Sequence, residues 1–497
     1  LQNPVSPMPN ALRYLLLPVL HALGPVLVGY GLTMLIPYLV SVAQADGADA
    51  AFLTAFAVTT GTGALLTLAT RGYSQELTAR HGFLLVTLTW TAVPLFATIP
   101  LLLELPQYTF SAAYFEMMSC LTTTGATMMT GLDDLPLSIN GLRCFLSWLG
   151  GMGLIVLSVA ILPLLGVGGA QILKAETSGP LKESKLTPRI ADTAQALYII
   201  YFGISVALTV AFHFAGMSWD DAVLHMMTTV SLSGIGAHDS SFAYFESNAV
   251  DLVTVVFMIV CGCNFSLHFA AWHKRDLRLY WRDPEVLGWV GVVSVLTLFT
   301  TLLLIDIGYY EDDFTAFVKA AFAVVSVAST TGFASDDYAL WPTIIPLVML
   351  LSSIFATCAG STGGGIKMIR LLILIKQTKR EFLLLLHPKA SFPLTVGETR
   401  LNDQVASAVL AYLLLWVISV GAGVLLLVFS GMPMLESFSA TIACINNLGQ
   451  AMGALGPAGN YAGLTTLQFW ICTFLMLIGR LELFTVFILF TKGFWRG

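Results

Sequence analysis

Four short runs of this sequence place hydroxyl or amide side chains next to a glycine, a pattern suited to binding a dehydrated cation. They lie around Gly125, Gly234, Gly332 and Gly449. Glycine permits positive φ values and close backbone approach, so carbonyl oxygens near it can turn toward a common axis. Rings of such oxygens can replace the hydration shell of a monovalent cation. The four runs therefore predict a cation pore, provided that they meet at one axis.

Each glycine taken alone also fits a simpler interpretation, because small residues are common where helices pack in membranes. The surroundings of the glycines favour the pore. Each one ends a short amphipathic stretch between longer apolar runs, and a small or polar break follows in the next run, near Gly151, Gly262, Gly360 and Gly479. Four copies at matching offsets indicate an internal repeat.

A glycine-rich segment, "CAGSTGGGIKMIR" at residues 358–370, is a second candidate for chemistry. Gly360, Gly365 and Lys367 nearly spell a nucleotide-binding P-loop. However, Ile366 separates the last glycine from the lysine, and Met368 occupies the place of the magnesium-binding hydroxyl. Because the flanking segments are also apolar, the context of a P-loop is missing and the nucleotide interpretation is disfavoured.

The composition indicates an all-α membrane protein. The chain has 497 residues, of which 57% are hydrophobic and 10% charged, and its mean hydropathy is +0.82. Soluble proteins carry about 25% charged residues. Apolar runs long enough to cross a bilayer recur from end to end, so we expect ten spans and four re-entrant helices of about a dozen residues each.

The basic residues predict the orientation. All but Arg143, Lys319 and Arg480 of the 23 Lys and Arg lie in segments that alternate with acidic loops. By the positive-inside rule the basic segments are cytoplasmic, as are both ends of the sequence. The segments are 71–80, 174–189, 274–282, 367–400 and 492–496, together with Arg13.

No arrangement typical of an enzyme emerges. The seven cysteines lie almost entirely in apolar runs, where we expect reduced, structural thiols. Neither a Ser-His-Asp set, a metal-ligand set nor a dinucleotide fingerprint is evident, so catalysis, a resident cofactor and nucleic-acid binding are not expected.

At the repeated glycines the chain resembles the Trk/Ktr/HKT superfamily of potassium transporters, most closely its bacterial TrkH-type members. The motifs "TTTGAT", "STTGFAS", "GSTGGGIK", "INNLGQ" and "GRLE" stand in the family's order. The resemblance implies four pore repeats around one pore, at 81–175, 190–280, 283–388 and 402–497. Two extra N-terminal transmembrane helices at 12–75 would precede them, with spans at about 12–43 and 50–70.

The resemblance also implies a selectivity filter with one quarter from each repeat. By position the filter residues are Thr123, Thr124, Gly125, Leu232, Ser233, Gly234, Thr330, Thr331, Gly332, Asn447, Leu448 and Gly449. Related proteins with serine in place of the first filter glycine tend to favour Na⁺, so Gly125 indicates K⁺. In the second repeat Ser233-Gly234-Ile235 departs from the Gly-Gly-Phe that is common in the family, which leaves the degree of selectivity open.

In the family a glycine-rich loop obstructs the pore on its cytoplasmic side. The resemblance therefore implies a gate at Gly360, Ser361, Thr362, Gly363, Gly364 and Gly365. A charge inside a span is costly unless it faces partners, so we expect Arg480 to hydrogen-bond the loop carbonyls; a pair with Glu482 is the alternative. Lys367 either belongs to the gate or extends toward the cytoplasmic surface.

The function predicted is K⁺ uptake across the bacterial inner membrane through a gated, channel-like pore that also passes Rb⁺, with Na⁺ as an open case. The resemblance implies a homodimer and a cytoplasmic TrkA-type regulatory ring. A nucleotide, ATP/ADP or NAD(H), would bind only to that ring. The segment 376–400 is a candidate docking surface. An H⁺- or Na⁺-coupled potassium transporter with alternating access is the alternative.

Overall fold

The computed structural model describes residues 8–73, 77–160, 186–355, 357–397 and 399–495. The end of the expected first repeat and most of the basic segment 174–189 lie outside these residues. The chain divides into two compact units. The first comprises Leu1–Met118, Asp134–Leu142 and Leu481–Gly497, and the second comprises Ser119–Asp133 and Arg143–Arg480.

The first unit is a helical bundle. Its helices are α1 (Met8–Thr33), α2 (Leu35–Gln44), α3 (Asp49–Ala69), α4 (Ala79–Glu104), α20 (Leu483–Phe487) and α21 (Lys492–Trp495). Helix α1 packs on α3 and α4. A side chain at Gly63 would meet the Gly24 carbonyl oxygen at 2.7 Å, so α1 and α3 approach closely through paired small residues. The two expected N-terminal spans appear as Leu12–Gln44 and Asp49–Ala69.

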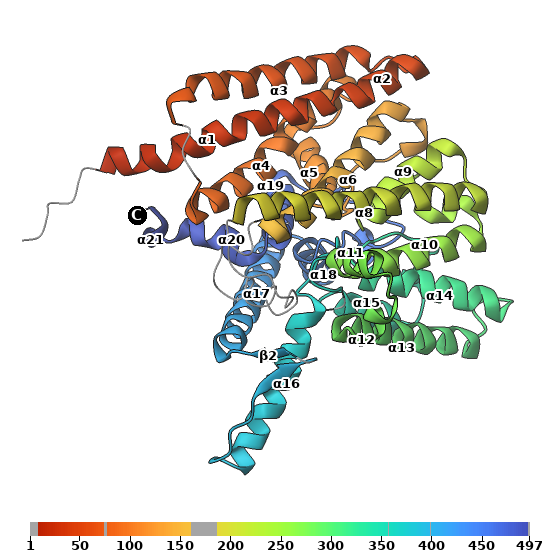
Figure 1. The fold of residues 1–497 in the computed structure, drawn as a ribbon. Helices are drawn as coiled ribbons and strands as arrows, with labels where there is room; N and C mark the ends of the chain where they lie inside the picture. Colours follow the sequence, from red (N-terminus) through yellow and green to blue (C-terminus); the bar gives the residue numbers. More distant parts are fainter. Residues whose placement is uncertain (1–7, 74–76, 161–185, 356, 398, 496–497) are drawn as a thin grey trace, which may run out of the picture. The chain divides into compact units, whose positions relative to one another are not determined.

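The second unit holds most of the remaining helices, which Figure 1 labels. Two helices cross the division between the units: α5 (Phe110–Leu121) and α6 (Leu137–Ala160). The others are α8 (Leu186–Ala215), α9 (Trp219–Val230), α10 (Asn248–Cys261), α11 (Phe265–Lys274), α12 (Arg278–Arg282), α13 (Pro284–Asp306), α14 (Asp313–Ala328), α15 (Ile344–Ser352), α16 (Met368–Leu386), α17 (Asp403–Phe429), α18 (Met434–Ile445) and α19 (Thr466–Arg480).

Four helices match the short re-entrant stretches expected from the sequence. Helices α5, α9 and α18 have 12 residues each, and α14 has 16. A 12-residue helix is too short to cross about 30 Å of hydrocarbon. Three of them pack against the helix that precedes or follows them, in the pairs α8 and α9, α13 and α14, and α17 and α18.

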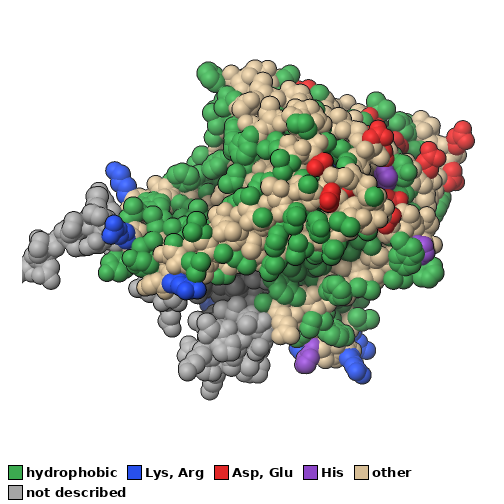
Figure 2. All heavy atoms as spheres, turned by 90° about the horizontal axis from the view of Figure 1, so that it is seen from above, with side chains coloured by type: hydrophobic (Ala, Val, Ile, Leu, Met, Phe, Trp, Pro, Cys, Tyr) green, Lys and Arg blue, Asp and Glu red, His purple; other side chains and the backbone are tan. Residues whose placement is uncertain are grey.

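The all-α membrane fold is confirmed, although length and composition alone do not reach ten spans. Six of the described helices are long and apolar enough to cross a membrane, or up to eight if each bent pair is one span. Of the other two expected spans, one includes α6, which ends at Ala160, the last described residue before the gap. The other includes α15, which has nine residues and ends before the glycine-rich loop. Much of the visible surface is hydrophobic (Figure 2), and Val295 and Leu425 are 67% and 71% exposed.

Two local expectations are corrected. Helix α6 continues through Gly151 without a break. The glycines there serve close packing instead, because a side chain at Gly150 would overlap the Leu121 carbonyl. The chain also contains a small antiparallel hairpin, β1 (Leu394–Val396) and β2 (Thr399–Leu401), at the end of the basic segment 376–400. Its apolar residues pack with the start of α16 and of α17.

Candidate functional site

All four short helices end in the same hydrogen-bonded turn. In each repeat the N–H of the middle predicted filter residue donates to a carbonyl five residues earlier, and the N–H of the first predicted filter residue donates to a carbonyl three residues earlier. This pair of bonds defines a Schellman motif, which satisfies carbonyls that a helix end leaves unpaired. The five-residue bonds are Thr124 to Ser119 at 2.8 Å, Ser233 to Thr228 at 2.9 Å, Thr331 to Ser326 at 2.8 Å and Leu448 to Ala443 at 2.8 Å.

The backbone after these turns is left-handed at two positions in every repeat. The first filter residues have φ values of 51° at Thr123, 53° at Leu232, 59° at Thr330 and 53° at Asn447. The glycines follow with φ of 85° at Gly125, 68° at Gly234, 84° at Gly332 and 80° at Gly449. A left-handed β-branched residue, such as Thr123 or Thr330, is a backbone outlier that costs on the order of 1–3 kcal/mol. The first filter residue is the C′ position of the Schellman motif, which adopts the left-handed conformation, so the turn itself accounts for this conformation in all four repeats.

The four glycines form a closed ring of contacts. A side chain at each glycine would overlap the middle filter carbonyl oxygen of another repeat. The pairs run around the ring: Gly125 with Ser233, Gly234 with Thr331, Gly332 with Leu448, and Gly449 with Thr124. Because the last pair returns to the first repeat, the structure brings all twelve predicted filter residues to one place.

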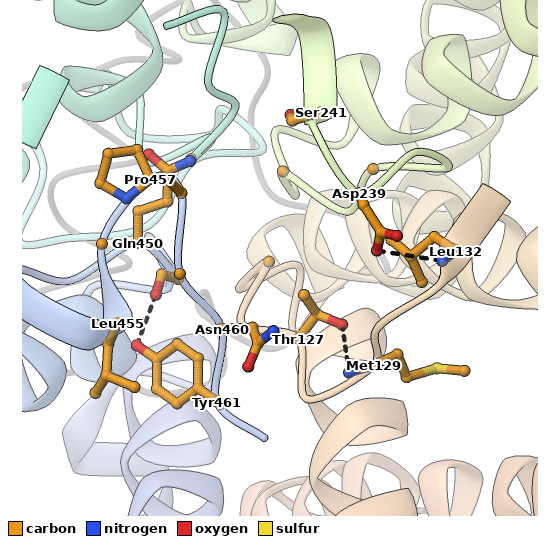
Figure 3. Close-up of a pocket in the computed structure, with 18 of the residues that line it drawn as sticks. Thr127, Met129, Leu132, Asp239, Ser241, Gln450, Leu455, Pro457, Asn460 and Tyr461 are labelled. Carbon is orange, nitrogen blue, oxygen red and sulfur yellow. Dashed lines mark hydrogen bonds between the residues drawn. The ribbon is translucent and has the colours of Figure 1, made fainter. Parts of the chain in front are cut away.

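All four glycines also line one cavity of about 320 Å³. Figure 3 shows Thr127, Gln450, Asn460 and Tyr461 around this space, with Asp239 at its edge. Its walls are mostly backbone and neutral polar groups. Among the described residues, no group of three or more His, Cys, Asp or Glu could hold a metal ion. The cavity therefore offers oxygen atoms to a weakly bound cation.

Side-chain hydrogen bonds hold residues within two of the turns and join one turn to another. Thr122 and Thr124 share a hydrogen bond of 2.8 Å, and Ser329 and Thr331 share an equivalent one of 2.6 Å. The Asn447 amide donates to the Thr124 hydroxyl at 3.0 Å and so links the fourth repeat to the first. These bonds hold the middle filter residues Thr124 and Thr331 and the first filter residue Asn447.

The glycine-rich loop lies directly against the ends of the short helices. The Thr362 hydroxyl donates to the Val230 carbonyl at 3.0 Å, at the end of α9. The Gly364 N–H donates to the hydroxyl of the filter residue Thr330 at 2.6 Å. A side chain at Gly364 would overlap the Asn446 carbonyl. The loop thus contacts the second, third and fourth repeats, and its glycines are required for that closeness.

Arg480 ties the loop to the first repeat. Its side chain is only 2% exposed. One guanidinium nitrogen donates to the Thr362 carbonyl at 2.9 Å and the other to the Gly150 carbonyl at 3.3 Å. Gly150 in turn packs against the end of α5 at Leu121. Arg480 therefore places a positive charge beside the loop, on the side of the first repeat.

Lys367 turns back toward the loop that it follows. Its amine donates to the Gly363 carbonyl and, at 3.5 Å, to the Thr357 hydroxyl. The Thr357 hydroxyl donates to the Gly364 carbonyl at 3.0 Å. Lys367 itself is left-handed, with φ of 76°. A cation and a hydroxyl thus hold two successive loop carbonyls.

The start of the loop is held by residues that sequence reasoning missed. The buried Glu285 carboxylate, in the first turn of α13, accepts the Ala359 N–H at 3.2 Å. The backbone between α10 and α11, which meet at 90°, exchanges hydrogen bonds with Cys358 and Gly360. The only local signal for Glu285 is the Asp-Pro-Glu helix start, which predicts a cap and not a contact 74 residues away.

Two of the cations that break the charge pattern bind carbonyls that follow the filter glycines. Arg143 is fully buried and donates to the Gly236 carbonyl and the Thr127 hydroxyl, both at 3.1 Å. Lys319 donates to the Ser335 carbonyl at 3.1 Å and forms an ion pair with buried Asp251 at 2.8 Å. Their burial among protein partners explains why they depart from the positive-inside pattern.

A histidine braces the outer loop of the second repeat. His238 bonds Asp133 at 2.5 Å and Asp221 at 3.1 Å. Burial disfavours its charged form, but the two carboxylates outweigh burial and raise the pKa of His238. Asp239 accepts the N–H groups of Gly131 and Leu132 at 3.0 and 3.2 Å. These bonds join the loops that follow the first and second filters.

Comparisons with known proteins agree with this geometry. The sequence model of the TrkH family, described as cation transport proteins, matches residues 48–495. The chain is 42% identical to the Trk system potassium uptake protein TrkH of Vibrio parahaemolyticus, over 96% of this chain and 99% of that protein. It is 41% identical to the Trk system potassium uptake protein TrkH of Escherichia coli, over 96% of this chain and 99% of that protein. It is 35% identical to TrkG of the same organism, over 96% of this chain and 98% of that protein. The crystal structure of the potassium transporter TrkH from Vibrio parahaemolyticus superposes with a TM-score of 0.90 at 40% identity, covering 96% of this chain and 99% of that one.

Proposed function

The chain belongs to the TrkH family of cation transport proteins, and from this premise we propose that it conducts potassium through one gated, channel-like pore. Family membership makes it a multi-pass membrane protein of potassium uptake. The pore mechanism, the filter and the gate are our proposals. The observation that supports them best is the closed ring of four glycines, which lines one cavity and lies beside the glycine-rich loop.

We propose that the filter consists of the twelve residues from Thr123–Gly125, Leu232–Gly234, Thr330–Gly332 and Asn447–Gly449. Within the described part of the chain, no donor bonds the carbonyl oxygens of the first three sets. Unpaired carbonyls at membrane depth are tolerated where they line a water-filled path. They can replace the hydration shell of K⁺ or Rb⁺, and the glycine at position 125 favours K⁺ over Na⁺.

The gate that we propose comprises Gly360 to Gly365 with Lys367 and Arg480. The loop contacts the ends of the short helices, so an ion leaving the filter on this side meets the loop first. The Arg480 guanidinium adds an electrostatic barrier to cations. Opening requires the loop to give up its bonds to the Val230 carbonyl and the Thr330 hydroxyl, which a glycine-rich backbone can do by rotating locally.

We place the protein in the bacterial inner membrane, with its basic segments and both ends of the sequence on the cytoplasmic side. We further propose that it forms a homodimer and is controlled by a TrkA-type ring, which would bind the nucleotide. The docking surface that we favour is α16 with the β1–β2 hairpin. Figure 1 shows α16 extending from the body of its unit, and a cavity of about 420 Å³ beside the hairpin includes Arg380 and Arg400.

An H⁺- or Na⁺-coupled transporter is the second candidate, because the loop closes one side of the site as alternating access requires. The relatives are named as transport proteins, and we propose that the chain has no enzymatic activity.

The experiment that separates these mechanisms measures radioactive Rb⁺ uptake, driven by a K⁺ gradient, into liposomes that contain the purified chain. Wild type is compared with a variant lacking 360–365 and with Arg480→Gln, which removes the charge but keeps the loop. Faster uptake in both variants, with weak competition by Na⁺, supports the gated pore. Uptake that occurs only when a Na⁺ or pH gradient is supplied overturns it in favour of coupled transport.

A further inference from the structure

The fourth repeat does not present its filter carbonyls as the other three do. The Gly449 carbonyl accepts a hydrogen bond of 2.6 Å from the Tyr461 hydroxyl, which Figure 3 shows as a dashed line. The Leu448 carbonyl accepts the Gln450 N–H at 3.0 Å. No described residue donates to the carbonyls of Gly125, Gly234 or Gly332. The ring of glycine carbonyls is therefore chemically asymmetric, although its backbone geometry repeats four times.

Tyr461 is held in place independently of this bond. It lies in the loop between α18 and α19 and is 2% exposed. Its N–H donates to the Thr127 carbonyl at 2.8 Å, two residues after the filter glycine of the first repeat. Because the backbone anchor fixes the tyrosine, the hydroxyl meets the Gly449 carbonyl at a set position.

We propose that Tyr461 is a positioning residue that sets the ion affinity and selectivity of the filter by occupying the Gly449 carbonyl with its hydroxyl. This inference rests on the proposed pore function. A carbonyl oxygen has two lone pairs, and an O–H donor takes one of them and draws electron density from the other. The fourth quarter of the glycine ring then binds a cation more weakly than the other three quarters.

A filter in which one of the four glycine carbonyls binds the ion more weakly can conduct faster. An ion must bind well enough to enter the filter and weakly enough to leave it. Four equally strong carbonyls would hold K⁺ longer, whereas one weakened carbonyl lets the ion pass more quickly. Tyr461 therefore lowers the affinity of the filter for K⁺ and raises the rate of conduction. Removing its hydroxyl should raise the affinity and lower the rate.

The chain offers a matched control in Tyr338. Its side chain is also buried, at 4% exposure, and its hydroxyl also donates one hydrogen bond beside the same cavity, at 2.7 Å. The acceptor is the Gln450 side chain and not a filter carbonyl. Tyr461→Phe and Tyr338→Phe thus each remove a buried tyrosine hydroxyl, but only the first frees a filter carbonyl; the Tyr461 hydroxyl also hydrogen-bonds the Cys444 thiol.

Two measurements on the purified full-length chain test the proposal. The first is the half-saturating K⁺ concentration, that is, the dissociation constant, obtained by fitting the logarithmic rise of thermal stability with K⁺ concentration; it reports binding whether or not the gate is open. The second is the Rb⁺ dependence of uptake into liposomes, with Na⁺ as competitor. For Tyr461→Phe we expect the half-saturating concentration to fall about fivefold, the factor that one net hydrogen bond is worth, while the maximal rate falls. Tyr338→Phe should leave both within about twofold of wild type.

A third variant, 3-fluorotyrosine at position 461, keeps the side chain and makes its hydroxyl a stronger donor. We expect it to raise the half-saturating concentration, so the proposal remains testable even if the phenylalanine variant does not fold. Equal effects of Tyr461→Phe and Tyr338→Phe would overturn the proposed role of Tyr461. So would a Tyr461→Phe protein whose half-saturating concentration and competition by Na⁺ both match wild type. Either result would leave the proposed pore function standing. A wild-type chain that neither binds K⁺ nor passes Rb⁺ would overturn the proposed function itself.

Discussion

Replacing Gly125 with alanine should make the proposed filter, which we expect to prefer K⁺, only weakly selective. Gly125 has φ of 85°, and a side chain there would overlap the Ser233 carbonyl oxygen of the second repeat. Ordinary contacts between a carbon and its neighbours begin near 3.5 Å, so that carbonyl would have to move by about 1 Å. The ring is closed, so the displaced carbonyl cannot move without disturbing the next repeat.

The size of the effect follows from two contributions. Alanine in the left-handed region costs about 1–2 kcal/mol, which lowers stability and says nothing about ions. Displacing one carbonyl from the ion removes an interaction of the kind made with charged groups, worth about 1.5–3 kcal/mol. Because each 1.4 kcal/mol is about tenfold in affinity, we expect the affinity for K⁺ to fall at least about tenfold. Since the ring of carbonyls is proposed to fit K⁺ better than Na⁺, the affinity for Na⁺ should fall less, and the preference for K⁺ should decrease by up to the same factor.

Gly131→Ala separates these contributions. Gly131 also has positive φ, 72°, but nothing lies within 4 Å of the position of its added side chain. Gly131→Ala should lose only the thermal stability that the left-handed backbone costs, whereas Gly125→Ala should lose more than this and also lose selectivity. The assay is Rb⁺ uptake into liposomes at increasing K⁺ or Na⁺. Retained K⁺ preference in a folded Gly125→Ala protein would refute the idea that the closed ring of carbonyls selects the ion.

Three further predictions concern the charged groups around the pore. Arg480→Ala should increase Rb⁺ flux and lower thermal stability, since the Thr362 carbonyl of the loop and the Gly150 carbonyl of α6 each lose a bond worth about 1.5–3 kcal/mol. Arg480→Lys should be intermediate, and flux equal to wild type in both variants would argue against a barrier. Folding raises the pKa of His238, so the protonated histidine stabilises the fold; this contribution is complete below pH about 6.5 and is lost as the pH rises through the folded-state pKa. The melting temperatures of wild type and His238→Gln should therefore converge toward pH 9, and a constant difference between them would contradict this prediction. Lys319→Met should lower the free energy of unfolding, measured with a chemical denaturant, by about 3–5 kcal/mol, because it leaves Asp251 buried and unpaired. Adding Asp251→Asn should restore much of this loss, and additive losses in the double variant would show that the two residues are not coupled.

The local features of the site could be predicted from the sequence because they depend on residue type. Glycine at 125 and its three counterparts marks backbone that other residues cannot adopt, and all four are left-handed in the structure. Short stretches before them predicted helices too short to span. The family followed from the same motifs and is confirmed.

What the sequence did not reveal depends on contacts between distant residues. Nothing in "TTTG" indicates that Thr123 itself is left-handed, because β-branched residues avoid that region and glycine or asparagine is the usual residue at such a helix end. The contact of Glu285 with the loop and that of Tyr461 with Gly449 carry no motif. The β1–β2 hairpin was missed because each strand has three residues, and its stability comes from packing on α16 and α17.

The Schellman turns at the ends of the short helices have a consequence for how the protein is made. Each is closed by hydrogen bonds that span only three and five residues, so its shape can form as soon as that repeat has been synthesised. The contacts around the glycine ring join residues about a hundred positions apart or more and must wait for the fourth repeat. Assembly then joins four Schellman turns that have already formed. This lowers the conformational entropy lost in the final step, which joins the residues farthest apart in the sequence.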